Sequence, residues 1–329
     1  MEKDNPKIKP IFIFSLPRSG STLLQRILTT HSKISSVAEP WFLLQELYVF
    51  KDEGIYSEYW HDHMNVAMTD LFNELPNGRD DYLKEIRQLT LELYKKLSNE
   101  EARYFLDKTP RYHLIINDII NLFPEAKFIV LWRNPLSVIS SLIESWQKGK
   151  WKIYQFHIDI YYGLNNIIQS YLKNKDRILA VNYEDLINNK ESTIKIIVKY
   201  LNLKYEKEMI EGFNNTIFKG RMGDSIGTQN YQNVTNKTLN KWMATYNNVY
   251  RKYWAIKYLE NIGELNLQLM GYNQKELITN IKGTKGYFSK LFSDIFYFVY
   301  GKIDSFLNFN IIKSNVKKII NRKRLTILR

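Results

Sequence analysis

Residues 11–26, IFIFSLPRSGSTLLQR, constrain the fold more than any other segment of the chain. Ile11 to Leu16 form a short, continuous apolar run, which is typical of a strand that is buried on both faces of a sheet. Pro17 and Gly20 end this run, and the residues from Ser21 onward have helical character. The segment therefore predicts a buried strand, a tight turn and a helix, which together begin an α/β fold.

The predicted turn has the chemistry of an anion-binding site. Gly20 allows the backbone to turn tightly, and the N–H groups of Ser19 to Thr22 at the start of the helix have no helical partners. Arg18 adds a planar cation, and the side chains of Ser21 and Thr22 add hydroxyl donors. The lysine of the GxxxxGK[ST] phosphate loop is missing, which argues against a nucleotide triphosphatase. Taken alone, the same residues also fit an ordinary serine-capped turn from strand to helix.

Three further apolar runs each end at a basic or aromatic residue. Lys108 and Thr109 lie beyond residues 103–106 (RYFL), Arg133 follows residues 127–132 (KFIVLW), and Tyr183 follows residues 177–182 (RILAVN). Ligands of open parallel sheets bind outside the carboxyl ends of the strands. We therefore expect a three-layer α/β/α fold with a central parallel sheet, in which three cations meet around a ligand with more than one negative group.

With these residues in place, the chain resembles the PAPS-dependent sulfotransferases, which transfer a sulfuryl group from 3′-phosphoadenosine 5′-phosphosulfate (PAPS). The resemblance implies a P-loop-like fold and covers about residues 9–272. LPRSGSTLL resembles the family's 5′-phosphosulfate loop, in the arginine form of the protein-tyrosine, glycan and bacterial enzymes. RNPLSVISS is similar to the 3′-phosphate element, VNYEDL to the segment that reaches the adenine, and KGRMGD to the stretch that closes over the 3′-phosphate. The cofactor-binding residues that the resemblance implies are Arg18, Ser19, Gly20, Ser21, Thr22, Arg133, Ser141, Tyr183, Lys219 and Gly220.

The catalytic base must differ from that of the cytosolic small-molecule branch. That branch has a histidine two residues after the lysine that Lys108 resembles, and this chain has Pro110 there. The tyrosine sulfotransferases keep a glutamate at the position of Glu39, so the resemblance assigns Glu39 as general base, with Lys108 and Arg18 stabilising the leaving group. His113 is the reserve candidate for the base. Glu39 also fits a purely structural role, as the cap of the segment that begins at Pro40.

A metal ion is not expected. The chain has no cysteine, and its five histidines show no ligand spacing apart from His61 and His63, a pair that is more often solvated than metal-bound. Cysteine-free composition fits a reducing compartment, and the charged residues 1–10 resemble no signal peptide or membrane anchor. We therefore expect a cytoplasmic protein.

The resemblance and the shift in composition after it imply three regions along the chain: an N-terminal arm (1–9), a sulfotransferase domain (10–273) and a basic amphipathic helical tail (274–329). A chain of 329 residues with 44% hydrophobic side chains can bury one large core. Between residues 41 and 101 the motifs stop; residues 80–97 predict an amphipathic helix, and Tyr56, Tyr59 and Trp60 are candidates for acceptor stacking. The tail has twelve Lys and Arg against three Asp and Glu, and apolar residues recur at helical spacing from Phe288 to Leu307.

The sequence thus predicts PAPS and a hydroxyl-bearing acceptor (a glycan, lipid or small metabolite) as partners. An anionic membrane surface is a further candidate partner for the tail, which would make the protein peripheral at the membrane; packing of the tail on the domain is the alternative. Nucleic acid is disfavoured, because most of the net charge of +13 lies in the tail and no nucleic-acid module is recognisable. Two other classes stay open: a non-catalytic module that binds nucleotide or membrane, and a nucleotide-dependent phosphotransferase.

Overall fold

The computed structural model describes residues 8–51, 61–216 and 239–307, together with the isolated positions 218, 312 and 316. Its centre is a five-stranded, wholly parallel sheet in the order β2-β3-β1-β4-β5. The strands are β1 (Lys9–Phe14), β2 (Ile34–Ser36), β3 (Tyr104–Asp107), β4 (Lys127–Trp132) and β5 (Ile178–Asn182). Four of them were expected from the sequence. β2 was not, because its three residues, ISS, are too short and too polar to form an apolar run.

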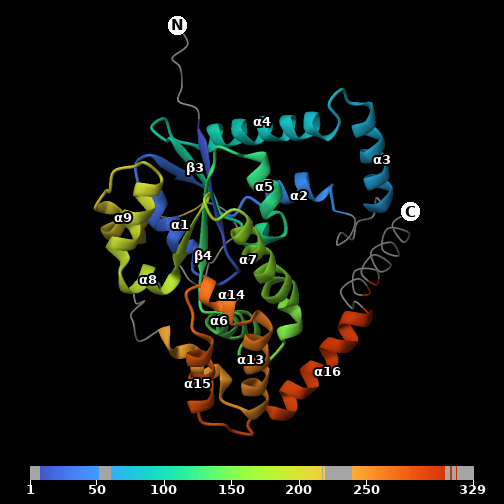
Figure 1. Ribbon diagram of the computed structural model, residues 1–329, viewed down its shortest axis with the longest axis vertical. Helices are drawn as coiled ribbons and strands as arrows, with labels where there is room; N and C mark the ends of the chain where they lie inside the picture. The colour runs from blue at the N-terminus through green and yellow to red at the C-terminus, as the bar shows by residue number, and fades with distance from the viewer. Residues whose placement is uncertain are drawn as a thin grey trace, which may run out of the picture.

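Helices surround the sheet (Figure 1). The α-helices are α1 (Ser21–Thr29), α2 (Phe42–Tyr48), α3 (His61–Glu74), α4 (Arg79–Leu97), α5 (Ile116–Leu122), α6 (Pro135–Gln147), α7 (Leu164–Lys173), α8 (Tyr183–Asn188), α9 (Lys190–Tyr200), α10 (Glu208–Glu211), α13 (Val249–Ile262), α14 (Glu264–Leu269), α15 (Gln274–Gly283) and α16 (Leu291–Leu307). Shorter 3₁₀ turns are η1 (Pro110–Leu114), η2 (Ile153–Phe156), η4 (Phe213–Asn215) and η6 (Lys241–Tyr246), and η3 (Ile158–Gly163) is π-helical.

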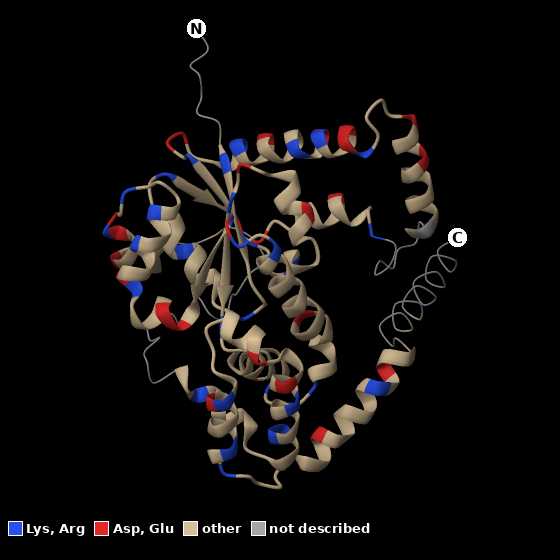
Figure 2. Ribbon diagram, in the orientation of Figure 1, with Lys and Arg blue, Asp and Glu red and all other residues tan. Residues whose placement is uncertain are grey.

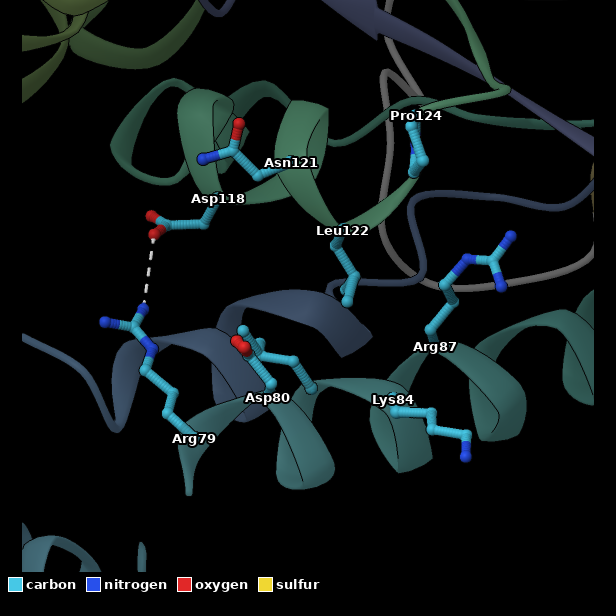
Figure 3. Close-up of a pocket in the computed structure, with 9 residues that line it drawn as sticks. Arg79, Asp80, Lys84, Arg87, Asp118, Asn121, Leu122 and Pro124 are labelled. Carbon is cyan, nitrogen blue, oxygen red and sulfur yellow. Dashed lines mark ion pairs between the residues drawn. The ribbon is translucent and has the colours of Figure 1, made fainter. Parts of the chain in front are cut away.

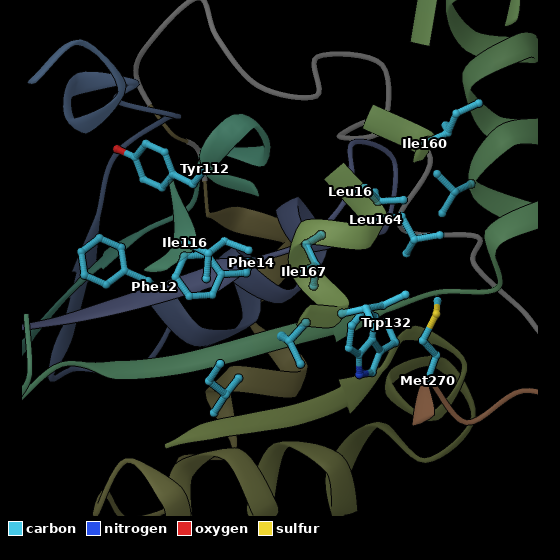
Figure 4. Packing of buried hydrophobic residues seen from close by; sticks show 14 of the residues in the cluster. Phe12, Phe14, Leu16, Tyr112, Ile116, Trp132, Ile160, Leu164, Ile167 and Met270 are labelled. Carbon is cyan, nitrogen blue, oxygen red and sulfur yellow. The ribbon is translucent and has the colours of Figure 1, made fainter. Parts of the chain in front are cut away.

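Alternation along β1 divides the core into two layers, because successive side chains of a strand point to opposite faces of the sheet. Ile11 and Ile13 pack in one cluster with residues of α1 and α9. Phe12 and Phe14 pack in the other cluster with residues of α4, α5 and α7, as Figure 4 shows in part. The expected α/β/α fold is therefore confirmed, with both faces of the sheet covered.

The helix expected over residues 80–97 is α4, and three of its residues are buried. Ile86, Thr90 and Tyr94 are buried, whereas Leu89 and Leu97 are about half exposed. Tyr94 is drawn inward because its ring stacks on Phe105 of β3, with 4.3 Å between centroids. Its hydroxyl also donates to Asp107. The hydrogen bond and the stacking together decide which face of the helix packs on the sheet.

Residues 274–307 pack against the rest of the domain. α15 buries Leu277 and Ile281 in the same core cluster as β1. α16 begins beside α13 and runs outward from it (Figure 1). The predicted helix within the tail is thus present as α16. Within the described part of the chain, no helix is both long enough and apolar enough to cross a membrane.

Candidate active site

The loop after β1 closes around two residues with left-handed backbone. Arg18 has φ 65° and Gly20 has φ 89°. A Cβ atom added at Gly20 would lie 2.4 Å from the ring of Tyr183, so both the backbone conformation and the close approach require glycine there. No side chain among the described residues caps α1, which leaves its first N–H groups facing this loop. Consecutive N–H groups at a helix start form the kind of concavity that holds an anion.

Arg18 and α6 are joined by two hydrogen bonds. The Arg18 side chain donates from Nε to Ser141 Oγ (3.1 Å) and from Nη2 to Ser145 Oγ (3.0 Å). The two serines share one face of α6 because they are four residues apart. Ser145 was missed by the sequence analysis, although its spacing from Ser141 could have revealed it.

Arg133, at the carboxyl end of β4, lies against the same loop. Its Nη1 donates to the carbonyl oxygen of Arg18 (2.6 Å), and its guanidinium lies 4.3 Å from the centre of the Tyr183 ring. Its buried Nε has no hydrogen-bond partner among the described residues. Burial raises the pKa of Tyr183, so its hydroxyl is neutral at pH 7. The next residue, Asn134, caps α6 through Leu136 N and Ser137 N and thereby fixes the turn that carries Arg133.

Lys108 and Glu39 form an ion pair on the other side of the loop. Lys108 Nζ donates to Glu39 Oε1 (2.6 Å) and to Thr22 Oγ1 (3.2 Å). Their side chains are 1% and 10% exposed, so this is a nearly buried pair. The indole N–H of Trp41 donates to Glu39 Oε2 (3.3 Å). Sequence reasoning missed Trp41, which stands two residues after Glu39 and has a positive φ of 58°.

Strand β2 explains how Glu39 reaches this position. It runs parallel to β3 at the sheet edge, and the chain leaving its carboxyl end carries Glu39 toward Lys108. Asp107, the last residue of β3, accepts hydrogen bonds from Tyr94 (2.6 Å) and Tyr112 (2.9 Å). Burial raises the pKa of Asp107 to about 6, against the lowering effect of these hydrogen bonds. The two tyrosines hold the strand end from which Lys108 projects.

His113 has a different set of contacts. Its Nε2 lies 2.9 Å from Asp159 Oδ1, and Asp159 also pairs with Arg111. The ring packs tightly against Gly163, where an added Cβ would lie 2.9 Å from it. These contacts fit a structural role for His113, the reserve candidate for the catalytic base. His61 is also buried, with its Nε2 2.6 Å from the carbonyl oxygen of Lys51.

The structure thus brings together Arg18, Ser141, Arg133, Tyr183 and Gly20 on one side of the loop, and Thr22, Lys108 and Glu39 on the other. Ser19 and Ser21 belong to the loop itself. Lys219 and Gly220 lie outside the described residues, as do Tyr56, Tyr59 and Trp60. In the part of the chain that the structure describes, His, Asp and Glu form no group of three or more that could hold a metal ion.

An open cleft of about 810 Å³ lies elsewhere, between α4 and α5 (Figure 3). Its lining carries both signs of charge, and Arg79 lies 3.9 Å from Asp118 across it. None of the loop residues described above lines it. Cations and anions are interspersed there, in contrast to the loop, where Arg18, Lys108 and Arg133 converge.

Residues 10–207 match the model of the sulfotransferase family. The chain belongs to this family. Among curated relatives, the nodulation protein NoeE of Sinorhizobium fredii is 33% identical over 139 residues, which are 41% of this chain and 31% of NoeE. Protein-tyrosine sulfotransferase 1 of Danio rerio is 22% identical over 63% of this chain and 56% of its own length. The chain therefore spans less than two thirds of either relative.

Among solved structures, the sulfotransferase domain from the Synechococcus PCC 7002 olefin synthase is 25% identical, with a TM-score of 0.49. The match covers 74% of this sulfotransferase-family chain and 90% of that domain. The matched family region, residues 10–207, contains the loop, Glu39, Lys108, Arg133, Ser141 and Tyr183.

Proposed function

We propose that this chain transfers the sulfuryl group of PAPS to a hydroxyl group of an acceptor. The observation that carries the proposal is the convergence of Arg18, Lys108 and Arg133 around the loop at the carboxyl ends of β1, β3 and β4. A ligand with several negative groups is the natural partner of such a cluster. Membership of the sulfotransferase family supports the same cosubstrate.

The roles of the binding residues follow from their positions. The N–H groups of residues 19–22 and the Arg18 guanidinium are proposed to hold the 5′-phosphosulfate. Arg133, whose Nε has no partner among the described residues, and Ser141 are proposed to bind the 3′-phosphate. Tyr183, buried beside Gly20, offers a ring face to the adenine. Lys219 and Gly220 are proposed to complete the 3′-phosphate site.

In the proposed reaction, the acceptor oxygen attacks sulfur in line with the bond from sulfur to the 5′-phosphate oxygen. That bond breaks, a new bond from sulfur to the acceptor oxygen forms, and the acceptor proton passes to Glu39. The products are a sulfate ester, 3′-phosphoadenosine 5′-phosphate (PAP) and a proton. Negative charge grows on the leaving phosphate, where Lys108 and Arg18 stabilise it. The described hydrogen bonds of Glu39, to Lys108 and Trp41, keep its carboxylate beside the loop.

The acceptor is proposed to be a hydroxyl of a glycan, lipid or small metabolite. Incubation with labelled PAPS and an extract of the host cells, followed by identification of the labelled product, tests the whole proposal. A labelled sulfate ester is expected with the wild-type chain and not with Lys108→Ala. Saturable binding of PAP without transfer to any acceptor would instead identify a non-catalytic nucleotide-binding module. Transfer of label from γ-labelled ATP would identify a phosphotransferase.

We also propose that the chain is cytoplasmic and binds peripherally to an anionic membrane surface through α16 and the residues after it. Phe292 and Phe306 of α16 are both 87% exposed, and Phe296 is 61% exposed. Most of the ribbon of this helix is tan in Figure 2, which colours charged residues blue or red. The sequence KKIINRKR at 317–324 follows it, so an apolar face is combined with a basic segment. Aromatic side chains at the lipid boundary and lysines beside acidic headgroups are the two components of such binding.

Point substitutions test the membrane proposal better than truncation, because removing residues 274–329 would also remove Leu277 and Ile281 from the core. Phe292→Ser combined with Phe306→Ser should reduce sedimentation of the protein with vesicles of phosphatidylcholine and phosphatidylserine. Leu265→Ser, at a site that is 81% exposed on α14, is the matched control and should sediment like the wild type. Added salt should weaken wild-type binding, since screening acts beyond about 8 Å at physiological ionic strength. Equal sedimentation of all three proteins would refute the role of α16.

A further inference from the structure

A second cavity, of about 370 Å³, lies between η2, η3, α13 and α16. Aromatic rings dominate its lining, among them those of Trp151, Tyr154, Tyr161, Tyr250, Trp254 and Phe298. No loop residue of the candidate active site lines it, nor do Glu39 and Lys108. The cavity is therefore separate from the site proposed for sulfuryl transfer.

The helix that forms the outer wall is held firmly against the domain. Arg251 of α13 donates to Asp294 of α16 through Nε (2.7 Å) and Nη2 (3.0 Å), and both side chains are buried. Asn248 donates to the same carboxylate (2.7 Å). Further along α16, a Cβ added at Gly301 would lie 2.7 Å from Tyr154, so glycine allows the helix to approach η2. With these contacts on both sides, the cavity has fixed walls.

Trp151 adds a buried polar group, its indole N–H, to the apolar lining of the cavity. Its side chain is 2% exposed, and its indole N–H has no hydrogen-bond partner among the described residues. The Arg251 guanidinium lies 4.8 Å from the centre of its ring, and Trp254 contacts the ring edge-on. Buried polar groups in proteins are nearly always paired, and protein interiors are closely packed. A ligand with an oxygen acceptor within reach of this N–H would pair it.

The surface around the cavity indicates the class of this ligand. Three polar residues of α16 also line the cavity, namely Lys302, Asp304 and Ser305, and they supply a cation, a carboxylate and a hydroxyl. The other side of the same helix carries the exposed Phe292 and Phe306, which are proposed above to meet lipid. A molecule that enters the cavity from this surface would come from the membrane. Its chain would contact the aromatic walls, and its polar head would lie near Lys302 and Asp304.

We propose that this cavity binds the acyl chain of a lipid. The inference goes beyond sulfuryl transfer and uses none of the residues assigned to it. Burial of an acyl chain among aromatic rings gains about 25 cal/mol for each Å² of apolar surface removed from water. Occupation would also fill the space between α16 and the domain, and so couple the fit of this helix to the presence of lipid.

Equilibrium dialysis with labelled oleic acid, below its micelle concentration, tests the proposal on the full-length protein. Saturable binding is expected. Ile153→Trp, which places a larger ring in the lining, should weaken it by about tenfold or more. Val249→Trp is the matched control, because Val249 is exposed on α13 and does not line the cavity. Unchanged oleate affinity in Ile153→Trp, absence of saturable binding, or saturable binding of maltose in place of oleate would each overturn the proposal.

Two further measurements keep the result unambiguous. Thermal stabilisation by PAP should be the same in the wild type and in these variants. If PAP does not stabilise the wild type, the result contradicts the proposed function and leaves the proposal for the cavity unaffected. Quenching of tryptophan fluorescence by dibromostearic acid locates the chain even if Ile153→Trp fails to fold. Trp254→Phe, in the lining, should lose part of the quenching, whereas Trp242→Phe, buried outside the lining, should keep it. Equal quenching in both variants would place the chain elsewhere.

Discussion

Glu39 and Lys108 lie 2.6 Å apart in a nearly buried pair, and this contact limits how either residue can be altered. Removing one member of such a pair leaves an uncompensated charge, which costs about 3–5 kcal/mol. A truncation at Glu39 would therefore confuse lost stability with lost catalysis. Glutamine keeps the shape, and its oxygen can still accept a hydrogen bond from Lys108. It also removes the negative charge that pairs with Lys108, so stability has to be measured beside turnover.

We predict that Glu39→Gln lowers turnover by roughly 10²-fold or more, with PAP affinity close to wild type and a lower free energy of unfolding, because Lys108 loses its counter-charge. Steady-state kinetics with labelled PAPS, together with urea denaturation, measure these quantities. Glu46→Gln on α2, the same change outside the described contacts of the site, is the control and should retain wild-type turnover. Near-normal turnover of Glu39→Gln, together with loss of turnover in His113→Gln, would assign the base to His113.

At the scale of elements, the carboxyl end of β3 is held by hydrogen bonds that converge on one buried carboxyl group. Tyr94 reaches Asp107 from α4 and Tyr112 reaches it from η1, so one acid ties a helix and a turn to the strand that carries Lys108. Burial raises the pKa of Asp107 to about 6, from 3.8 for the ordinary group. The folded protein therefore binds a proton at Asp107 more tightly than the unfolded chain does.

This shift predicts a pH dependence of stability. The contribution of Asp107 should be fully present below about pH 4 and lost as the pH rises through about 6, which amounts to about 3 kcal/mol. Asp107→Asn removes the titrating group. The free energy of unfolding of the wild type, measured by urea denaturation relative to Asp107→Asn, should therefore fall between pH 4 and pH 7. Parallel pH profiles of the two proteins would show that Asp107 does not titrate in this range.

Elements with strong local patterns could be predicted from the sequence, and elements fixed by distant contacts could not. Buried strands such as Lys127–Trp132 are continuous apolar runs, and the loop at 17–22 combines Pro, Gly and Ser in a pattern with few alternatives. β2 has no such pattern, because pairing with β3 makes it a strand. Tyr94 likewise points inward because its hydroxyl donates to Asp107 and its ring stacks on Phe105, and neither contact can be read from the local sequence. Trp41 could be recognised only when the fold placed it beside Glu39.

At the scale of the whole molecule, parallel pairing brings the residues that follow the described strands to one side of the sheet, at the carboxyl ends of the strands. Arg18, Lys108, Arg133 and Tyr183 come from four strands, and β2 leads to Glu39 on the same side. The charge is distributed differently: residues 274–329 hold twelve Lys and Arg against three Asp and Glu, in a chain of net charge +13. The nucleotide and the membrane are thus proposed to meet separate regions of the protein, the carboxyl ends of the strands and α16.

The most direct test of the central claim compares PAP with adenosine 5′-monophosphate, which lacks the 3′-phosphate, by thermal unfolding of the full-length protein. PAP at a hundredfold excess over its dissociation constant should stabilise the fold by about 2.7 kcal/mol, and the monophosphate at the same concentration should stabilise it much less. Arg133→Ala should remove most of this difference, because it removes the cation proposed to hold the 3′-phosphate. Equal stabilisation of the wild type by the two nucleotides would contradict the account.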